Sequence, residues 1–173
     1  MESKGLSISY GGVLRKPTLS NNPSPSIAAT IEGSPLGDFN VLAIWAKPTP
    51  TYFEDVMATL DVHRSFIAER PTVIMGDFNM DVRIRDKGRH FYTVNARLNS
   101  EFNLFSAYHE FTDERFGMET MPTLYFKWGY EGCFHCDFIY VPAPWISRIK
   151  SVSVAPYRDW ESSDHRPVIC EIV

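Results

Sequence analysis

The sequence predicts an α/β or layered α+β fold, in which two β-sheets stack and helices cover their outer faces. Residues 39–77 alternate a strand-like run, a helical pattern and a second strand-like run, an order typical of sheets covered by helices. Residues 123–173 alternate strand-like runs with turns, so the C-terminal half is rich in β-structure. A chain of 173 residues is the usual size of one domain, and we expect a single domain over residues 1–173.

The N-terminal half supplies the strand–helix–strand unit. Short apolar runs predict strands at 6–10, 26–33, 39–48 and 72–77. A helix is predicted over 52–69, where apolar side chains recur at helical spacing and a proline follows at position 71. The apolar face of that helix comprises Phe53, Val56, Met57, Leu60 and Ile67.

The C-terminal half begins with a second helical pattern. It predicts one continuous helix over residues 93–111. Four strand-like runs follow, and they predict strands at 123–128, 134–142, 146–156 and 166–173.

Composition excludes several classes of protein. Seventeen basic and twenty-one acidic residues give a net charge of −4, which argues against coating nucleic acid through a basic surface and leaves room for a local basic patch. No apolar run approaches the ~20 residues of a membrane helix, so we expect no membrane partner. The first residues lack the layout of a signal peptide, and three cysteines make no disulfide framework. These features favour the cytoplasm.

The stretch TVIMGDFNM, residues 72–80, drives an apolar strand into Gly-Asp-Phe-Asn. If the extended geometry continues, Asp77 and Asn79 share one face and Phe78 returns to the core. Two oxygen-bearing side chains at the end of a buried strand are a candidate reactive site. The alternative is a turn, because Gly, Asp and Asn are common turn residues. These residues alone leave both interpretations open.

A second unusual strand, FHCDFIYV, carries a carboxylate in an apolar run. Strand alternation places His135, Asp137 and Ile139 on one face. Burying a carboxylate costs free energy unless it has a partner. Asp137 is therefore either a solvated residue of an edge strand or the partner of a histidine.

The third stretch is Ser163-Asp164-His165, directly before the last predicted strand. Histidine is the usual general base near neutral pH, and a carboxylate behind it fixes its tautomer. Asp164 is poorly placed for that task because neighbouring side chains diverge. Asp137, from another strand, could perform it.

GDFN, CDFIY and SDHRPV, in this order, resemble the motifs of the exonuclease–endonuclease–phosphatase superfamily, and PTLYF resembles a strand that often precedes the second motif. The resemblance spans residues 5–173. It implies a four-layered sandwich, in which two mixed β-sheets pack face to face with helices outside. It also implies metal-dependent hydrolysis of a phosphoester substrate such as DNA, most plausibly by a nuclease.

The resemblance assigns roles to five residues. His165 would be the general base or stabilise the transition state, with Asp137 as its orienting partner. Asp77 and Asn79 would position the attacking water and bind phosphoryl oxygens. Asp164 would either bind Mg²⁺ or Mn²⁺ directly or support a residue that does, because hard cations prefer carboxylate oxygen.

Members of the superfamily normally begin with a strand that carries an asparagine and a second strand that ends in a metal-binding glutamate. The family-like segment Lys4-Gly5-Leu6 stands almost at the start of this sequence, so we expect an N-terminally incomplete domain with weaker cation binding. We also expect an exposed sheet edge that a homodimer covers. The alternative function is a catalytically weak or inactive homologue that acts as a binding or structural protein.

Three further residues are candidates for contact with substrate. His135 and His90 could touch phosphate or line a groove, and ordinary packed or solvated histidines are the alternative. Trp45 stands near the position where relatives use His or Tyr to touch phosphate. Cys133 and Cys136 form a C-x-x-C pair, but a zinc site is disfavoured because strand positions three apart face opposite ways.

Overall fold

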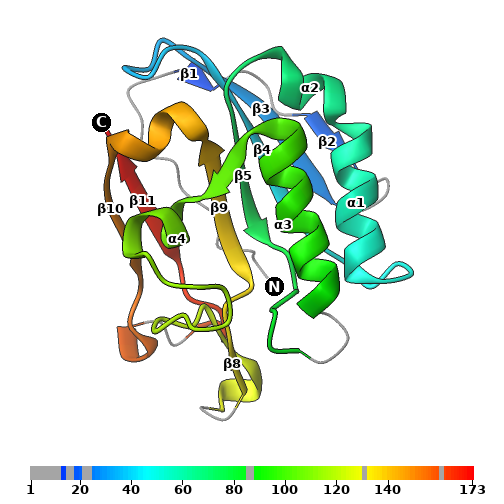
Figure 1. Ribbon diagram of the computed structural model, residues 1–173, viewed down its shortest axis with the longest axis vertical. Coiled ribbons are helices and arrows are strands. Elements are labelled where there is room, and N and C mark those ends of the chain that lie inside the picture. The colour runs from blue at the N-terminus through cyan, green and yellow to red at the C-terminus, as the bar shows by residue number, and fades with distance from the viewer. Residues whose placement is uncertain (1–12, 15–17, 21–24, 85–87, 130–131, 160–161) are drawn as a thin grey trace.

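The computed structural model describes residues 13–14, 18–20, 25–84, 88–129, 132–159 and 162–173, so the strand predicted at 6–10 lies outside the described residues. Figure 1 shows the arrangement of the elements. The largest sheet contains seven strands among the described residues. In chain order they are β1 (Val13–Leu14), β2 (Thr18–Ser20), β3 (Ser26–Glu32), β4 (Phe39–Trp45), β5 (Thr72–Asp77), β6 (Leu104–Ser106) and β9 (Asp137–Pro142).

This sheet is mixed, as predicted. The strand order is β1-β3-β4-β5-β9-β6, and β2 also pairs with β3. β4 and β5 are parallel, and the other strand pairs are antiparallel. Two helices, α1 (Tyr52–Val62) and α2 (Arg64–Glu69), form the crossover between the parallel strands. The predicted helix over 52–69 therefore exists, with a break at His63.

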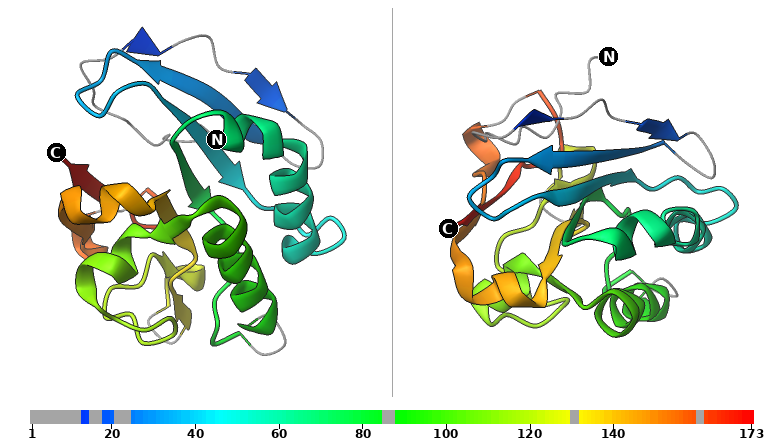
Figure 2. Two further views of the ribbon diagram at one scale, coloured as in Figure 1. Left: turned by 45° about the horizontal axis from the view of Figure 1, so that its top comes forward. Right: turned by 90° about the horizontal axis from the view of Figure 1, so that it is seen from above.

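Helices cover one face of the large sheet. α1 and α3 (Gly88–Phe102) lie side by side on it (Figure 2). Thr51 begins α1 by accepting the Glu54 amide hydrogen at its side-chain oxygen, 3.2 Å away. Such an N-cap satisfies one of the free amides of a helix start. The core on this face joins Leu42, Ile44, Ile74, Phe138 and Tyr140 of the sheet to Val56, Leu60, Ile67, Val94 and Leu98 of the helices.

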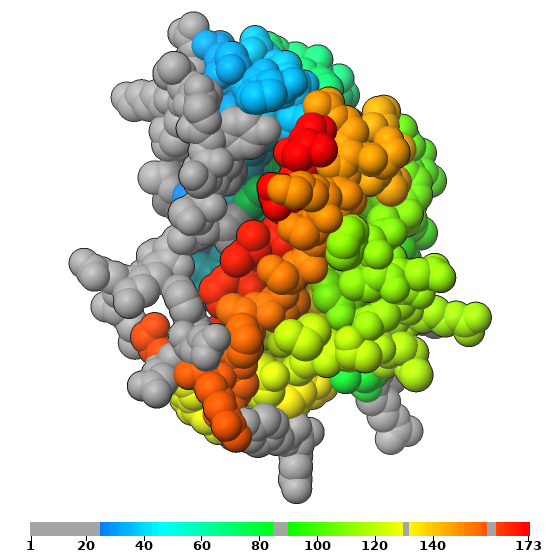
Figure 3. Space-filling view, turned by 90° about the vertical axis from the view of Figure 1, so that its left-hand side faces the viewer, coloured from blue at the N-terminus to red at the C-terminus, as the bar shows by residue number. Residues whose placement is uncertain are grey.

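A smaller sheet of β10 (Ile149–Val154) and β11 (Val168–Ile172) packs against the other face. The second core lies between the two sheets and contains Val41, Val73, Met75, Val141 and Trp145, with Val152, Cys170 and Ile172 against them. This confirms that two sheets stack. In Figure 3, β10 and β11 run side by side on the viewer's face. Lys150, Ser153, Ile169 and Glu171 are exposed there.

The predicted helix over 93–111 is wrong in its middle. The chain leaves α3 at Asn103, whose φ of 55° is left-handed, a conformation that ends helices. β6 follows and pairs with β9, and then α4 (Ala107–Thr112) begins. The sequence looked like one helix because the buried apolar residues of α3, β6 and α4 follow one another at spacings that fit a helix.

The remaining elements are short. A two-stranded sheet pairs β7 (Leu124–Tyr125) with β8 (Cys133–Phe134). The strand predicted at 123–128 is thus shorter than expected, because Lys127 and Trp128 have φ values of 55° and 60°. Three 3₁₀ helices complete the described elements: η1 (Phe126–Trp128), η3 (Ala143–Arg148) and η4 (Tyr157–Asp159).

Within the described ranges, no helix has the length and apolarity to cross a membrane. Within the same ranges, β11 pairs with β10 alone. A homodimer that covers the free edge of β11, the edge that does not pair with β10, stays a prediction.

Candidate active site

Two acidic residues lie together where β5 ends and β9 begins. The two strands are antiparallel, and their register places Asp77 directly opposite Asp137. Both side chains lie on the face that packs on the smaller sheet, because Val73 and Met75 precede Asp77 at spacings of two and belong to the core between the sheets. Residues sixty positions apart in the sequence thus share one end of the space between the sheets.

The GDFN stretch combines the two interpretations of its sequence. β5 ends at Asp77, and Phe78 is fully buried in the core beneath the helices. The chain then turns, since Asn79 has a φ of 53° and donates its backbone amide hydrogen to Oδ1 of Asp77 over 2.8 Å. The Asn79 side-chain amide donates to the other Asp77 oxygen, Oδ2, over 2.6 Å and to the carbonyl of Ala46 over 3.2 Å. The turn therefore holds the Asp77 carboxylate in place.

His165 pairs with Asp137, the partner that sequence reasoning favoured. Its Nδ1 lies 2.9 Å from Oδ2 of Asp137. The His165 backbone amide donates to the hydroxyl of Ser163 over 3.1 Å, and its backbone forms an antiparallel bridge with Leu124. Because Nδ1 faces the carboxylate, Nε2 points away from it. This is the arrangement by which a carboxylate orients a catalytic imidazole.

Thr123, which sequence reasoning did not single out as a site residue, fastens these segments to one another. Its hydroxyl oxygen accepts the backbone amide hydrogens of Cys136 and Asp137 over 3.0 and 3.1 Å. Its carbonyl accepts the amide hydrogen of Arg166 over 2.6 Å. One fully buried threonine therefore fixes the Asp137 segment against the His165 segment.

We expect Thr123→Val to lower the free energy of unfolding by about 2 kcal/mol, because it leaves two buried amide hydrogens without an acceptor. Urea denaturation followed by circular dichroism measures the loss. Thr49→Val is the control, since Thr49 is an exposed threonine. A Thr123→Val protein as stable as the wild type would contradict this role.

The protonation of the site follows from burial and from the facing charges. Burial and the neighbouring Asp137 raise the pKa of Asp77 to about 7, although His165 and Asn79 act in the opposite direction. Burial alone would lower the pKa of His165, but the bond to Asp137 and the charges of Asp137, Asp77 and Asp164 outweigh it and raise that pKa to about 9. The imidazole of the metal-free site is therefore protonated at neutral pH.

Four residues whose side chains can bind a metal ion lie together in this site. Among the described residues, Asp77, Cys136, Asp137 and His165 each offer one ligand atom, and these atoms all lie within 4.8 Å of one another. Asp164, the predicted metal ligand, is not in this group, and its carbonyl accepts the amide hydrogen of Tyr125 over 2.8 Å. Cys136 was missed because strict alternation turned it away from Asp137. β9 begins only at Asp137, so alternation does not extend back to residue 136.

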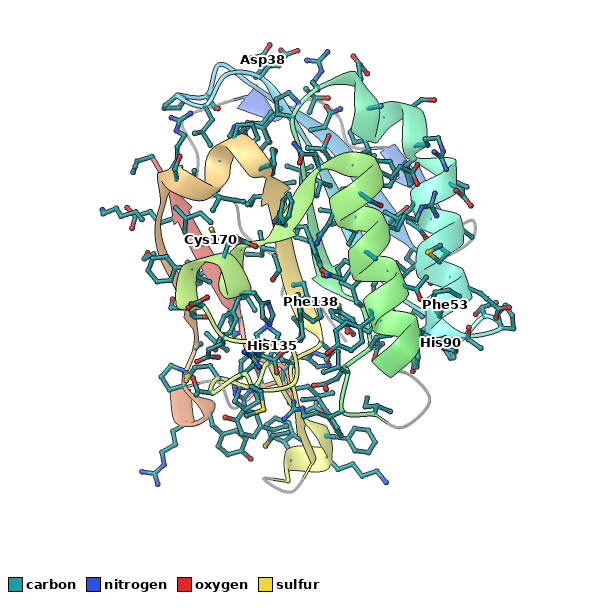
Figure 4. The ribbon with its side chains drawn as sticks, in the orientation of Figure 1. Asp38, Phe53, His90, His135, Phe138 and Cys170 are labelled. Carbon is teal, nitrogen blue, oxygen red and sulfur yellow. The ribbon has the colours of Figure 1, made fainter. Side chains whose placement is uncertain are left out.

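The prediction that His135 shares a face with Asp137 is wrong for the same reason. His135 is 1% exposed, and its ring lies 5.1 Å from that of Phe138, a residue of the core on the helix-covered face (both labelled in Figure 4). Its Nδ1 lies 3.0 Å from the carbonyl oxygen of Met121. His135 is thus part of the core and is not placed to contact substrate.

His90 and Trp45 lie outside the four-residue group. His90 stacks on Phe53 with ring centroids 4.6 Å apart, where α1 and α3 begin (Figure 4). Trp45 pairs with Asp77 in the parallel register of β4 and β5, and its side chain is 53% exposed. The Lys47 ammonium lies 2.7 Å from the centre of the Trp45 ring. Trp45, unlike His90, therefore lies beside the Asp77–Asp137 pair.

Known structures share this architecture. The chain aligns with a 3′ phosphatase from Neisseria, solved with a product DNA hairpin, at a TM-score of 0.69 and 17% identity, over 94% of this chain and 72% of that one. The chain has the exonuclease–endonuclease–phosphatase fold. An AP endonuclease from Archaeoglobus fulgidus aligns at a TM-score of 0.63 and 14% identity, over 93% of this chain and 72% of that one. The human Nocturnin catalytic domain aligns at a TM-score of 0.56 and 18% identity, over 92% of this chain and 58% of that one.

No protein-family profile and no curated protein sequence matches the chain. At these identities the solved structures establish the exonuclease–endonuclease–phosphatase fold alone. The fold is one that nucleases and phosphatases share, and it places GDFN, CDFIY and SDHRPV at one end of the stacked sheets.

Proposed function

We propose that this chain hydrolyses phosphoester bonds in nucleic acid with the help of a divalent cation. One observation carries the proposal: Asp77, Asp137 and His165, from three distant segments, meet at the ends of the stacked sheets. A histidine held by one carboxylate beside a second carboxylate is suited to move a proton and to stabilise charge on a phosphoryl group. The nucleic acid substrate is inferred from the neighbours, one of which was solved with DNA.

His165 acts through Nε2, the ring nitrogen that faces away from Asp137. In the protonated state favoured by its raised pKa, it donates a hydrogen bond to a phosphoryl or leaving oxygen. Asp137 holds the ring and stabilises its positive charge. Asn79 keeps the Asp77 carboxylate in place through the two bonds within its turn, so that Asp77 can orient an attacking water.

The donor set fits a hard cation in part. Asp77 is a half-buried carboxylate that faces Asp137, and its pKa is raised by burial and by the negative charge of Asp137. Asp77, with Asp164 as the second predicted carboxylate, would hold Mg²⁺ or Mn²⁺ through oxygen. Such a cation would neutralise negative charge on the phosphoryl group.

Hydrolysis assays on the purified chain test the proposal. Plasmid DNA, a 3′-phosphorylated oligonucleotide and a small nitrophenyl phosphodiester are incubated with Mg²⁺ or Mn²⁺. We expect hydrolysis by the wild type, and we expect His165→Ala and Asp137→Asn to lower the rate by at least about 100-fold, because each removes half of the pair that moves the proton.

Glu171→Gln is the matched control, since Glu171 is an exposed carboxylate paired with Lys150 on the outer face of the smaller sheet. It should retain the wild-type rate. Equal rates for wild type and His165→Ala would exclude catalysis by this site. DNA binding without hydrolysis by any of these proteins would instead favour the inactive, binding homologue.

A further inference from the structure

The candidate active site contains a thiol that phosphoester hydrolysis does not require. Cys136 is 2% exposed, and its Sγ lies 3.7 Å from Oδ2 of Asp137. A ligand atom of Asp77 also lies within 4.8 Å of this sulfur. A buried sulfur between two carboxylates adds a soft donor to a site whose other donors are oxygen and nitrogen.

The backbone holds this sulfur firmly. The amide hydrogen of Cys136 donates to Thr123 over 3.0 Å, and its carbonyl accepts the amide hydrogen of Phe78 over 2.9 Å. Cys136 is thus tied directly to the GDFN turn and, through Thr123, to Arg166 beside His165. The backbone that carries the thiol is therefore bonded to GDFN and linked through Thr123 to SDHRPV.

The four donor residues lie close enough together for one small ion to contact them all. Metal–ligand bonds of 2.0–2.3 Å imply about 3.3–3.8 Å between ligand atoms of tetrahedral zinc. Oδ2 of Asp137 lies 2.9 Å from Nδ1 of His165 and 3.7 Å from Sγ of Cys136, and no pair among the four exceeds 4.8 Å. Zinc binding would therefore require the His165–Asp137 pair to open by about 0.4 Å and the widest pair to close by up to about 1 Å.

We propose that Asp77, Cys136, Asp137 and His165 form an inhibitory site for Zn²⁺. Thiolate and imidazole ligands favour zinc over magnesium and manganese. On binding, Cys136, Nδ1 of His165 and the protonated fraction of Asp77 lose their protons to solvent, and all four residues form bonds to zinc. The hydrogen bond between His165 and Asp137 is then replaced by two bonds to the ion. This site differs from the C-x-x-C pair, because Cys133 contributes no ligand.

Cobalt binding to the metal-free chain tests the site without substrate. Co²⁺ takes the place of zinc and gives a thiolate-to-cobalt charge-transfer band in the near ultraviolet when sulfur is a ligand. We expect that band with wild type and with the matched controls Cys133→Ser and Cys170→Ser. We expect it to vanish in Cys136→Ser and Cys136→Ala. One equivalent of Zn²⁺ should remove the wild-type cobalt spectrum, and a large excess of Mg²⁺ should leave it unchanged.

Absence of the band in the wild type, or its persistence in the folded Cys136 variants, would overturn the proposal. If both Cys136 variants fail to fold, His165→Ala and Asp137→Asn decide: each should weaken cobalt binding at least tenfold, and wild-type affinity in both would overturn it. The assay needs no hydrolytic activity, so its outcome is separate from that of the proposed function. Where hydrolysis is observed, Zn²⁺ should inhibit it at the concentration that displaces cobalt.

Discussion

Gly76→Ala should remove a large part of the stability of the chain. Gly76 has a φ of 132°, and a Cβ atom built on it would lie 2.0 Å from the carbonyl oxygen of Ile44 on the neighbouring parallel strand. Since that oxygen belongs to the backbone of a central strand, the two strands must separate. We expect a loss of about 4 kcal/mol or more, a large part of the 5–15 kcal/mol that stabilises typical domains.

Thermal denaturation measures this effect, and Gly33→Ala is the matched control. Gly33 also has a positive φ, 69°, but a Cβ atom there would meet nothing within 4 Å. We expect Gly33→Ala to cost about 1 kcal/mol, the strain of a left-handed alanine alone. Similar melting temperatures for the two variants would show that backbone strain, and not the contact with β4, explains the glycine in GDFN.

Asp77→Asn should stabilise the metal-free chain at alkaline pH. The pKa of Asp77 is about 7 in the folded chain, against 3.8 for an ordinary aspartate. Between these values the unfolded chain releases a proton that the folded chain keeps, so the contribution of Asp77 to wild-type stability falls as the pH rises from about 4 to about 7 and is then constant. The variant lacks this loss. The stability difference between variant and wild type should grow by about 2–4 kcal/mol from pH 4 to pH 8.

Melting temperatures in EDTA across this pH range test the prediction. Glu171→Gln is the control: Lys150 lowers the pKa of Glu171, so that variant cannot show the same rise with pH. A pH-independent difference between Asp77→Asn and wild type would contradict the raised pKa. We also expect Asp77→Asn to lose hydrolytic activity, because the charge that destabilises the fold is the charge that orients water.

Much of the fold followed from local sequence patterns. β3, β4, β5 and the helices between β4 and β5 were predictable. Their signals, the spacing of apolar residues and the proline at position 71, lie within a few residues of the elements that they specify. The wrong predictions lie where the backbone conformation changes within a regular pattern of apolar residues. Asn103 adopts a left-handed conformation inside an apparent helix. Likewise β9 starts at Asp137, so alternation misplaced His135 and Cys136.

The sequence by itself determined which groups this protein can use: the carboxylates, amide and imidazole of GDFN, CDFIY and SDHRPV, and the partnership of His165 with Asp137. Only the tertiary structure decided that the Cys136 sulfur joins them, that Thr123 ties their segments, and that Gly76 makes room for a neighbouring strand. The physical reason is that side-chain type is encoded locally. Strand register and the approach of backbones arise from pairing between segments far apart in the chain.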